Sequence, residues 1–398
     1  MNEKRMTLVS VLLAVYFGLA PINQTLTLSN GSTVNKYLAL VIMILLVLRQ
    51  LRGSARTGEG RELLSLILPI AIFGVFSLIW TLSFSGSLST LISELEYMIF
   101  AYLVCCEIWS KREKTLFMLT IVVASVLYSL MLIDQQVTGR STITILNDDS
   151  SDPNMLSVGI SFGIIIALRI YLVTSRKLVK YAALFALGTS FLGILNTGSR
   201  GGLIACIVGC GIILIKGKGG RRNSGRVLLL LLLAVTGLWL ILTSKTSVNS
   251  YVLNRYLEKS SLEGGNGRLE IWGYYFSVFN KNPYGYLIGY GFGLDSVAFS
   301  ILRGSAWRPS THNDYISILC YGGIVLLAMF YRLIKRTIMR AKRMNNIAGM
   351  GILFVALAAI LTLNCIKTPI WWNALILAYI GLDFSENRPY LEEYQNEE

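Results

Sequence analysis

Charged side chains are scarce in this sequence: Asp, Glu, Lys and Arg together make up 15% of the 398 residues. Soluble globular proteins carry about 25%. Hydrophobic residues account for 54% of the chain, and many of them stand in runs of membrane-spanning length. These runs exclude a soluble enzyme, a secreted disulfide scaffold and a disordered chain. The sequence therefore predicts an integral membrane protein.

Cysteines are absent from the polar loops, where a disulfide or a zinc cluster would form. All six fall inside or at the edge of apolar runs, so we interpret them as small buried hydrophobic residues. They are Cys105, Cys106, Cys206, Cys210, Cys320 and Cys365. A small-residue cleavage site is also lacking after the first apolar run, so we expect that run to be an uncleaved span.

Apolar stretches recur along the chain and predict an all-α polytopic membrane protein with about 12 transmembrane helices. Most are long enough to cross a hydrocarbon core of about 30 Å. The stretches are 7–21, 37–51, 63–83, 88–108, 115–133, 154–173, 179–195, 202–215, 227–243, 313–331, 347–365 and 370–382.

The basic residues predict the orientation, because Lys and Arg gather in cytoplasmic loops. With the N-terminus inside, 25 of the 36 Lys and Arg residues fall in inside segments and 11 in outside ones. Seven of those 11 lie in one long loop, 244–312, and long translocated loops are largely exempt from the rule. This distribution predicts an N-in, C-in topology, and it accounts for the net charge of +14 without a nucleic-acid partner.

This predicted topology divides the chain into four regions. Residues 1–243 hold helices 1–9, residues 244–312 form a large extracytoplasmic loop, and residues 313–382 hold helices 10–12. Residues 383–398 form an acidic cytoplasmic tail. The loop is far longer than a connection needs to be, so function is sought there.

The long loop is rich in aromatic residues, and its segment 268–279 (RLEIWGYYFSVF) predicts an amphipathic helix. Its rings, Trp272 and Tyr275 among them, have two open interpretations. They could anchor the loop at the lipid headgroups, or they could stack on sugar faces. Glycines flank the helix, including the run GYGFG at 289–293, and they would permit left-handed turns and close backbone approach to a ligand.

Arginines on the outer side are candidates for binding an anion. Arg200 opens an apolar helix after NTGS, where the helix dipole and free N–H groups favour negative charge. Its guanidinium could bind phosphate or extend to lipid headgroups. Arg268 begins the amphipathic helix and could close on the same anion, while Arg255, Arg303 and Arg308 are weaker candidates.

Other titratable residues stand near the outer face. His312 is the single histidine and could exchange a proton near neutral pH, with Asn313 and Asp314 beside it to orient the ring. Glu94 and Glu96 lie within the fourth span, where carboxylates are costly and are often functional. Either could act as a general base or pair with an arginine.

The acidic segment NDDSSDPN at 147–154 has two interpretations. Asp148, Asp149 and Asp152 could form a divalent-metal cluster, but no outer histidine or further carboxylate completes one. A turn and helix cap, with Pro153 in the first turn of the next span, is favoured. We therefore expect no metal and no cofactor.

Taken in order, these motifs resemble the O-antigen polymerase/ligase superfamily. They are DPN at 152–154, TGSRGGLIA around Arg200, GRLEIW at 267–272, GYGFG, and HNDYISILCYGG from His312. The spacing from Arg200 to Gly211 also fits an arginine–glycine pattern of the family's polymerases. The resemblance covers roughly residues 140–331; outside them only the topology fits.

The resemblance implies a metal-independent, inverting glycosyltransferase on the outer face of the bacterial cytoplasmic membrane. Its donor would be an oligosaccharide on undecaprenyl diphosphate, held by Arg200 and Arg268, with His312 activating the acceptor hydroxyl. It implies polysaccharide biosynthesis for the cell envelope, such as capsule or exopolysaccharide, with flippase and chain-length regulator proteins as partners.

Three functions remain to be compared. A polymerase would pass the glycan to another lipid-linked repeat unit, and we favour it because nothing in the sequence indicates a lipid A core acceptor. A ligase would transfer the glycan to lipid A core or another acceptor. A transporter that flips lipid-linked sugars would instead need charges deep in several spans and broken helices near the midplane.

Overall fold

The computed structural model describes residues 6–29, 31–52, 58–133, 142–145, 150–216, 267–304, 306 and 308–382. Several predictions lie outside these residues: the ninth span at 227–243, Asp148, Asp149, Arg255 and the acidic tail. The described chain is helical apart from turns and two isolated β-bridges, at Thr27–Thr33 and Thr144–Ser150. The predicted all-helical class is thereby confirmed.

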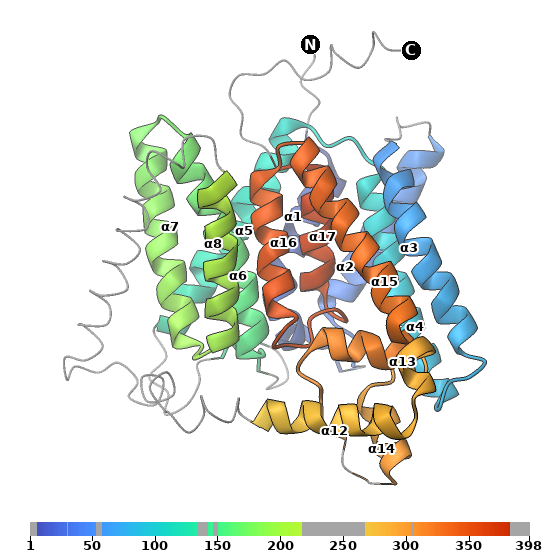
Figure 1. Ribbon diagram of the computed structural model, residues 1–398. Helices are drawn as coiled ribbons and strands as arrows, with labels where there is room; N and C mark the ends of the chain where they lie inside the picture. Colours follow the sequence, from blue (N-terminus) through green and yellow to red (C-terminus); the bar gives the residue numbers. More distant parts are fainter. Residues whose placement is uncertain are drawn as a thin grey trace, which may run out of the picture.

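The helices form an upright bundle with a smaller layer of short helices across one end (Figure 1). Their bounds are α1 (Leu8–Leu19), η1 (Ala20–Leu26), α2 (Val34–Leu51), α3 (Gly58–Ser77), α4 (Phe84–Cys105), α5 (Lys111–Ile133), α6 (Pro153–Val173), α7 (Lys177–Asn196), α8 (Arg200–Lys216), α12 (Arg268–Lys281), α13 (Tyr284–Ile288), α14 (Ser296–Arg303), α15 (Asp314–Arg343), α16 (Ile347–Ala359) and α17 (Pro369–Ile380).

Eight of the described helices are long and apolar enough to cross a membrane. They are α1 with η1, α2 to α7, and α15, and each overlaps a predicted span. The predicted spans at 202–215, 347–365 and 370–382 coincide with α8, α16 and α17, which have 17, 13 and 12 residues. The described chain thus supports a multi-pass protein, while the total of twelve spans and the membrane sidedness stay predictions.

Short polar residues begin several of these helices by capping free N–H groups. Thr7 accepts from the Ser10 N–H at the start of α1, and Asp152 accepts from the Asn154 N–H at 2.7 Å ahead of Pro153 in α6. Asn313 accepts from two N–H groups at the start of α15. Each cap fixes where the chain turns into the bundle.

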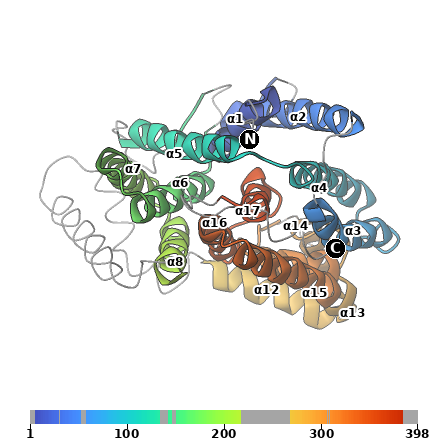
Figure 2. The same ribbon diagram turned by 90° about the horizontal axis from the view of Figure 1, so that it is seen from above.

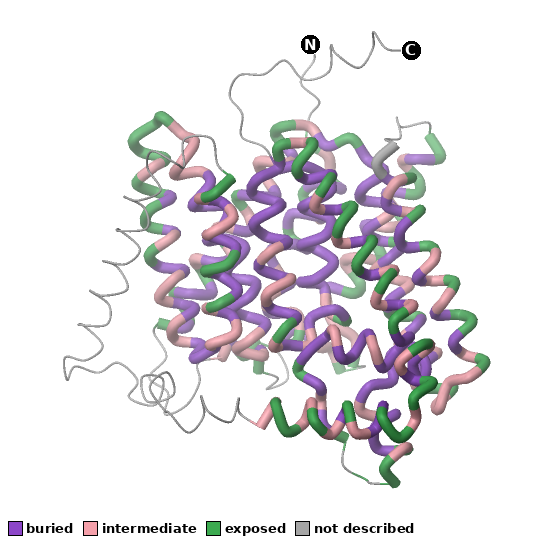
Figure 3. The backbone as a smooth tube through the Cα atoms, viewed as in Figure 1, coloured by how far each residue is buried: buried purple, intermediate pink, exposed green. Residues whose placement is uncertain are grey.

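The central helices pack closely because small residues face one another. A Cβ on Gly163 would collide with Ser125 of α5, and one on Gly202 of α8 would collide with Ser157 of α6. Such small-residue contacts let helix backbones approach within a membrane. The result is a core in which α16 and α17 stand at the centre (Figure 2) and are buried along most of their length (Figure 3).

The outward sides of the peripheral helices expose apolar residues instead of polar ones. On α2, for example, Leu40, Val41 and Ile44 are all exposed. Exposed apolar surface of this extent is expected where lipid, and not water, surrounds a helix. The bundle therefore has the surface of a membrane protein.

The described part of the long loop, 267–304, folds as α12, α13 and α14 beneath the bundle (Figure 1). The predicted amphipathic helix at 268–279 is present as α12. Its buried face carries Tyr275, Val278 and Phe279, so one side of α12 rests on protein.

The glycine run after α13 forms the predicted turns, but its backbone approaches protein side chains closely where a ligand was predicted. Gly289, Gly291 and Gly293 all have positive φ, of 70°, 122° and 79°. A Cβ on Gly291 would collide with Thr81, and one on Gly293 with Thr90. The run therefore docks the loop against the α3–α4 turn and the start of α4.

Helix α15 is interrupted at Gly322 and Gly323, whose backbone angles are not helical. The φ of Gly323 is +60°, and a Cβ there would collide with the backbone of Leu287 in α13. The interruption lets α13 pack directly onto α15. A broken helix was the feature expected of a transporter, but here its glycines make room for the outer layer.

Candidate active site

Arg200 is the first residue of α8 and is only partly exposed. Its Nε and Nη2 atoms are buried and have no hydrogen-bond partner in the described part of the chain. A buried guanidinium nitrogen without an acceptor is costly. Together with the positive end of α8, these nitrogens are suited to binding an anion.

The start of α6 links Arg200 to the rest of the site. The preceding residue, Ser199, donates from its hydroxyl to Asn154 Oδ1 at 3.0 Å. Asp152, two residues before Asn154, is close enough to His312 to interact with it electrostatically. The first turn of α6 therefore contacts the residue before Arg200, and Asp152 just ahead of it lies within electrostatic range of His312.

A second link runs through the turn between α16 and α17. A Cβ on Gly201, next to Arg200, would lie 2.6 Å from Thr362 Oγ1. Within the same turn, Asn364 donates to Ser310 Oγ at 2.6 Å and accepts from Thr311 Oγ1 at 3.1 Å. The α8 start, this turn and the segment before His312 are thus connected by direct contacts.

Helix α12 holds that segment from the other side. Trp272 Nε1 donates to the Thr311 carbonyl at 2.8 Å, and Tyr275 Oη donates to the Pro309 carbonyl at 2.8 Å. Tyr275 is buried, so stacking of its ring on a sugar, one of the two predicted interpretations, is wrong for this residue. Both aromatic residues position the backbone that carries His312.

His312 has a φ of 47°, which lies in the left-handed region. Non-glycine residues held there are uncommon and cluster at functional sites. Partial burial and the nearby Arg268 guanidinium lower the pKa of His312, while Asp152 acts in the opposite direction. The imidazole is therefore neutral near pH 7 and can accept a proton.

Asn313 and Asp314 do not orient the His312 ring as predicted, because their side chains bind backbone elsewhere. Asn313 Oδ1 accepts from the N–H groups of Tyr315 and Ile316. Asp314 Oδ2 accepts from the N–H groups of Cys365 at 2.6 Å and Ile366 at 2.9 Å. Asp314 is buried, and it joins the start of α15 to the α16–α17 turn.

The two candidate glutamates of α4, Glu94 and Glu96, have different surroundings and different partners. Glu94 is buried and accepts from Trp372 Nε1 at 3.3 Å, while Lys367 and Asp314 are close enough to interact with it electrostatically. Glu96 is partly exposed and forms an ion pair with Lys36 at 3.2 Å, so its cation is a lysine and not an arginine.

Sequence reasoning missed Lys367 as a site residue. Its Nζ donates to the Gly293 carbonyl at 3.1 Å, lies 4.0 Å from Asp295 Oδ1 and stands over the Tyr321 ring. It is the single basic residue between 344 and 387 in the sequence, and that isolation could have drawn attention to it. Lys367 ties the outer layer to the buried carboxylates beneath the site.

The weaker arginine candidates are dispersed. Arg308 is exposed, and Arg303 stacks over the rings of Tyr274 and Phe299. The capping interpretation of Asp152 is confirmed by its bond to Asn154. Among the residues that the structure describes, no group of three or more His, Cys, Asp or Glu side chains could hold a metal ion. All six cysteines are free and buried, as predicted.

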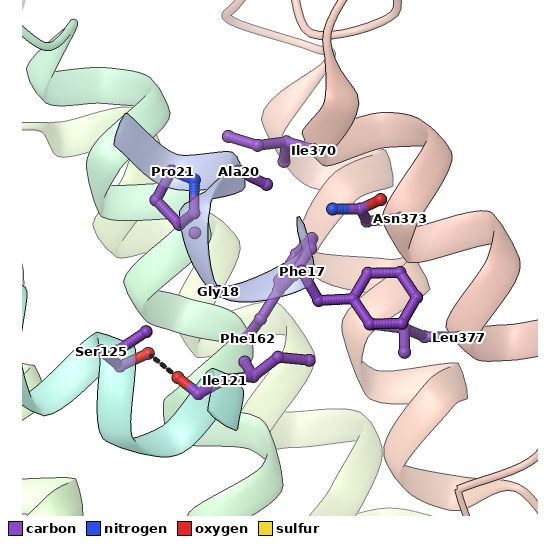
Figure 4. Close-up of a pocket in the computed structure, with 12 residues that line it drawn as sticks. Phe17, Gly18, Ala20, Pro21, Ile121, Ser125, Phe162, Ile370, Asn373 and Leu377 are labelled. Atoms are coloured by element: carbon purple, nitrogen blue, oxygen red, sulfur yellow. Dashed lines mark hydrogen bonds between the residues drawn. The ribbon is translucent and has the colours of Figure 1, made fainter. Parts of the chain in front are cut away.

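A small cavity between α1, η1, α5, α6 and α17 is lined mainly by apolar residues (Figure 4). Its volume is about 10 Å³, which is room for about one water molecule. The cavity is too small for a substrate-sized ligand, and none of the predicted site residues lines it.

Comparison with known proteins agrees with the sequence motifs. Residues 183–331 match the family model described as O-Antigen ligase, a range that includes Arg200, Arg268 and His312. None of the curated proteins matches the chain. A chain from the solved structure described as "Structural coordination of polymerization and crosslinking by a peptidoglycan synthase complex" is 17% identical, with 81% of this chain and 94% of that chain covered and a TM-score of 0.42. That score is too low to transfer a fold or a function.

The described helices support a multi-pass membrane protein, and residues 183–331 are similar to the O-antigen ligase family. This match confirms the resemblance of that part of the chain to the O-antigen polymerase/ligase superfamily.

Proposed function

We propose that this protein transfers an oligosaccharide from undecaprenyl diphosphate to a second lipid-linked repeat unit, at the outer face of the bacterial cytoplasmic membrane. The observation that carries the proposal is the Arg200 guanidinium at the positive end of α8, whose buried Nε and Nη2 atoms have no hydrogen-bond partner in the described chain. A lipid diphosphate is a ligand whose charge and geometry suit such a donor set.

In the proposed reaction, the acceptor hydroxyl oxygen attacks the anomeric carbon of the donor sugar. The bond from that carbon to the diphosphate oxygen breaks, and its electron pair leaves with the diphosphate. A single displacement of this kind inverts the anomeric configuration. Arg200 and Arg268 stabilise the negative charge that grows on the leaving group.

The hydroxyl proton passes to His312, whose lowered pKa keeps the imidazole unprotonated at neutral pH. Arg268 contributes twice, since it faces the diphosphate and also keeps His312 neutral. Guanidinium groups supply the positive charge in this scheme, so the reaction needs no divalent cation.

The acceptor decides between a polymerase and a ligase. We favour the polymerase, as the sequence indicates no lipid A core acceptor; a ligase would use the same donor site with a different acceptor. A transporter is disfavoured, because the break in α15 accommodates α13.

Reconstitution tests the proposal. The purified full chain, reconstituted in vesicles, would receive lipid-linked repeat units together with lipid A core as an alternative acceptor, and products would be separated by glycan length and mass. Elongated lipid-linked glycan is the expected product. Transfer to lipid A core alone would identify a ligase. Movement of unmodified lipid-linked sugar between the leaflets of vesicles, without elongation, would overturn the enzymatic proposal.

A further inference from the structure

A second cavity, separate from the arginine–histidine site, lies between α1, η1, α2 and α4. Its volume is about 400 Å³, within the range of about 300–1,000 Å³ that is usual for small-molecule sites. The lining residues are Tyr16, Asn23, Gly31, Ser32, Thr33, Asn35, Lys36, Tyr37, Ala39, Leu40, Met43, Ser93, Glu96, Tyr97, Phe100 and Pro369.

Polar groups in this cavity are buried without partners. Asn35 is 1% exposed, and neither its Nδ2 nor its Oδ1 atom has a hydrogen-bond partner in the described chain. The same holds for the hydroxyl of Tyr16, also 1% exposed, and for Asn23 Oδ1. Buried polar atoms are normally satisfied, so these atoms await the hydrogen bonds of a ligand.

The cavity is electrically balanced. Lys36 is the one basic residue among its described lining residues, and its Nζ forms an ion pair with Glu96 Oε2 at 3.2 Å. An anionic headgroup would have to compete with Glu96 for that lysine. The free groups are neutral amides and a hydroxyl, which both donate and accept, and they match the hydroxyls of an uncharged sugar.

Aromatic and apolar side chains complete the lining. Tyr97 stacks on Trp372 with ring centroids 6.3 Å apart, and Trp372 in turn binds Glu94, so this ring pair stands between the cavity and the buried carboxylate. Leu40 also lines the cavity, although it is 50% exposed on the apolar outer side of α2. The polar interior therefore meets lipid-facing surface.

From this combination we propose that the cavity binds the uncharged sugar head of a glycolipid, with the lipid chains lying along α2. Asn35 and Tyr16 hydrogen-bond the sugar hydroxyls, and the apolar side of α2 contacts the lipid. This site is separate from the diphosphate site, and binding there does not depend on catalysis.

Native mass spectrometry of the full chain in nanodiscs tests this site, with glucosyl-diacylglycerol as the probe and phosphatidylglycerol and free glucose as comparisons. Selective binding of the glycolipid is expected. Equal retention of phosphatidylglycerol would overturn the proposal, and so would equal binding of free glucose, because it would remove the lipid from the recognition.

Two variants locate the binding. Asn35→Leu and Tyr16→Phe should each weaken glycolipid binding, Asn35→Leu by about tenfold or more, since each loses hydrogen bonds to the sugar. Asn280→Leu is the matched control, because Asn280 lies exposed on α12 outside the cavity. Unchanged binding in both cavity variants would refute the site.

Stability separates a ligand-binding role from a structural one. Without ligand, Asn35→Leu should melt at the same or a higher temperature, because it replaces an unpartnered buried amide with an apolar group. A markedly lower melting temperature would show that Asn35 serves the fold and would count against the proposal. No donor substrate is present, so failure of the enzymatic proposal would leave this binding result unaffected.

Discussion

Asp314 provides the sharpest test of the arrangement beneath His312. Its Oδ2 atom accepts from the N–H groups of Cys365 at 2.6 Å and Ile366 at 2.9 Å, and all three residues are buried. Asp314→Ala would leave both N–H groups buried without an acceptor. At about 1–3 kcal/mol for each, the expected loss of unfolding free energy is about 2–6 kcal/mol.

Asp314→Asn is the informative companion, since its amide oxygen can still accept from both N–H groups. We expect this variant to unfold much closer to the wild type than Asp314→Ala does. The six free, buried cysteines supply the assay, because a thiol-reactive fluorophore labels them only as the protein opens. Labelling measured against temperature then ranks the wild type, Asp314→Ala and Asp314→Asn by the temperature at which each protein opens.

Two outcomes would refute this reasoning. If Asp314→Ala opened at the wild-type temperature, the contacts to the α16–α17 turn would carry no stability. If Asp314→Asn were as unstable as Asp314→Ala, the essential property would be the negative charge and not the acceptor oxygen. Glycan elongation by a stable Asp314→Asn variant would further show that Asp314 supports the site without acting on the substrate.

Three further predictions concern the site chemistry and the outer layer. Arg268→Gln should raise the pKa of His312, because Arg268 lowers it, so the acid limb of the kcat/KM profile should move to higher pH; an unmoved limb would contradict the assignment of His312 as base. Gly323→Ala should destabilise the protein by at least about 1–3 kcal/mol, because φ is +60° and the new Cβ meets Leu287 backbone, whereas Gly273→Ala on α12 has open space and should be neutral or slightly stabilising in the same labelling scan. Chelation with EDTA should leave elongation unchanged, and a loss restored by added Mg²⁺ would reject the metal-independent scheme.

Hydropathy predicted the helices well, because a span must bury its backbone polar groups in lipid and so requires a long apolar run. The DPN segment also predicted the Asp152 cap and the start of α6 correctly, since capping depends on neighbouring residues. Local sequence carried the same information for α12, whose RLEIWGYYFSVF pattern marks one buried face.

Contacts between distant segments could not be predicted in this way. The amphipathic pattern of α12 did not indicate that Tyr275 would be buried with its hydroxyl on the Pro309 carbonyl. The sequence around Asp314 likewise did not indicate that its carboxylate would bind the backbone of Cys365, 51 residues further along the chain. Lys367 joins Gly293 and Asp295 only through the tertiary fold, so no local spacing signals its contacts.

Arg200 carries the central claim, and a comparison of variants in the reconstituted elongation assay tests it most directly. Arg200→Ala should abolish elongation, and Arg200→Lys should restore little, since a lysine cannot present the same paired donors to a diphosphate. Arg332→Ala, at an exposed arginine of α15 outside the site, should elongate normally. Wild-type elongation by a correctly inserted Arg200→Ala protein would contradict the account.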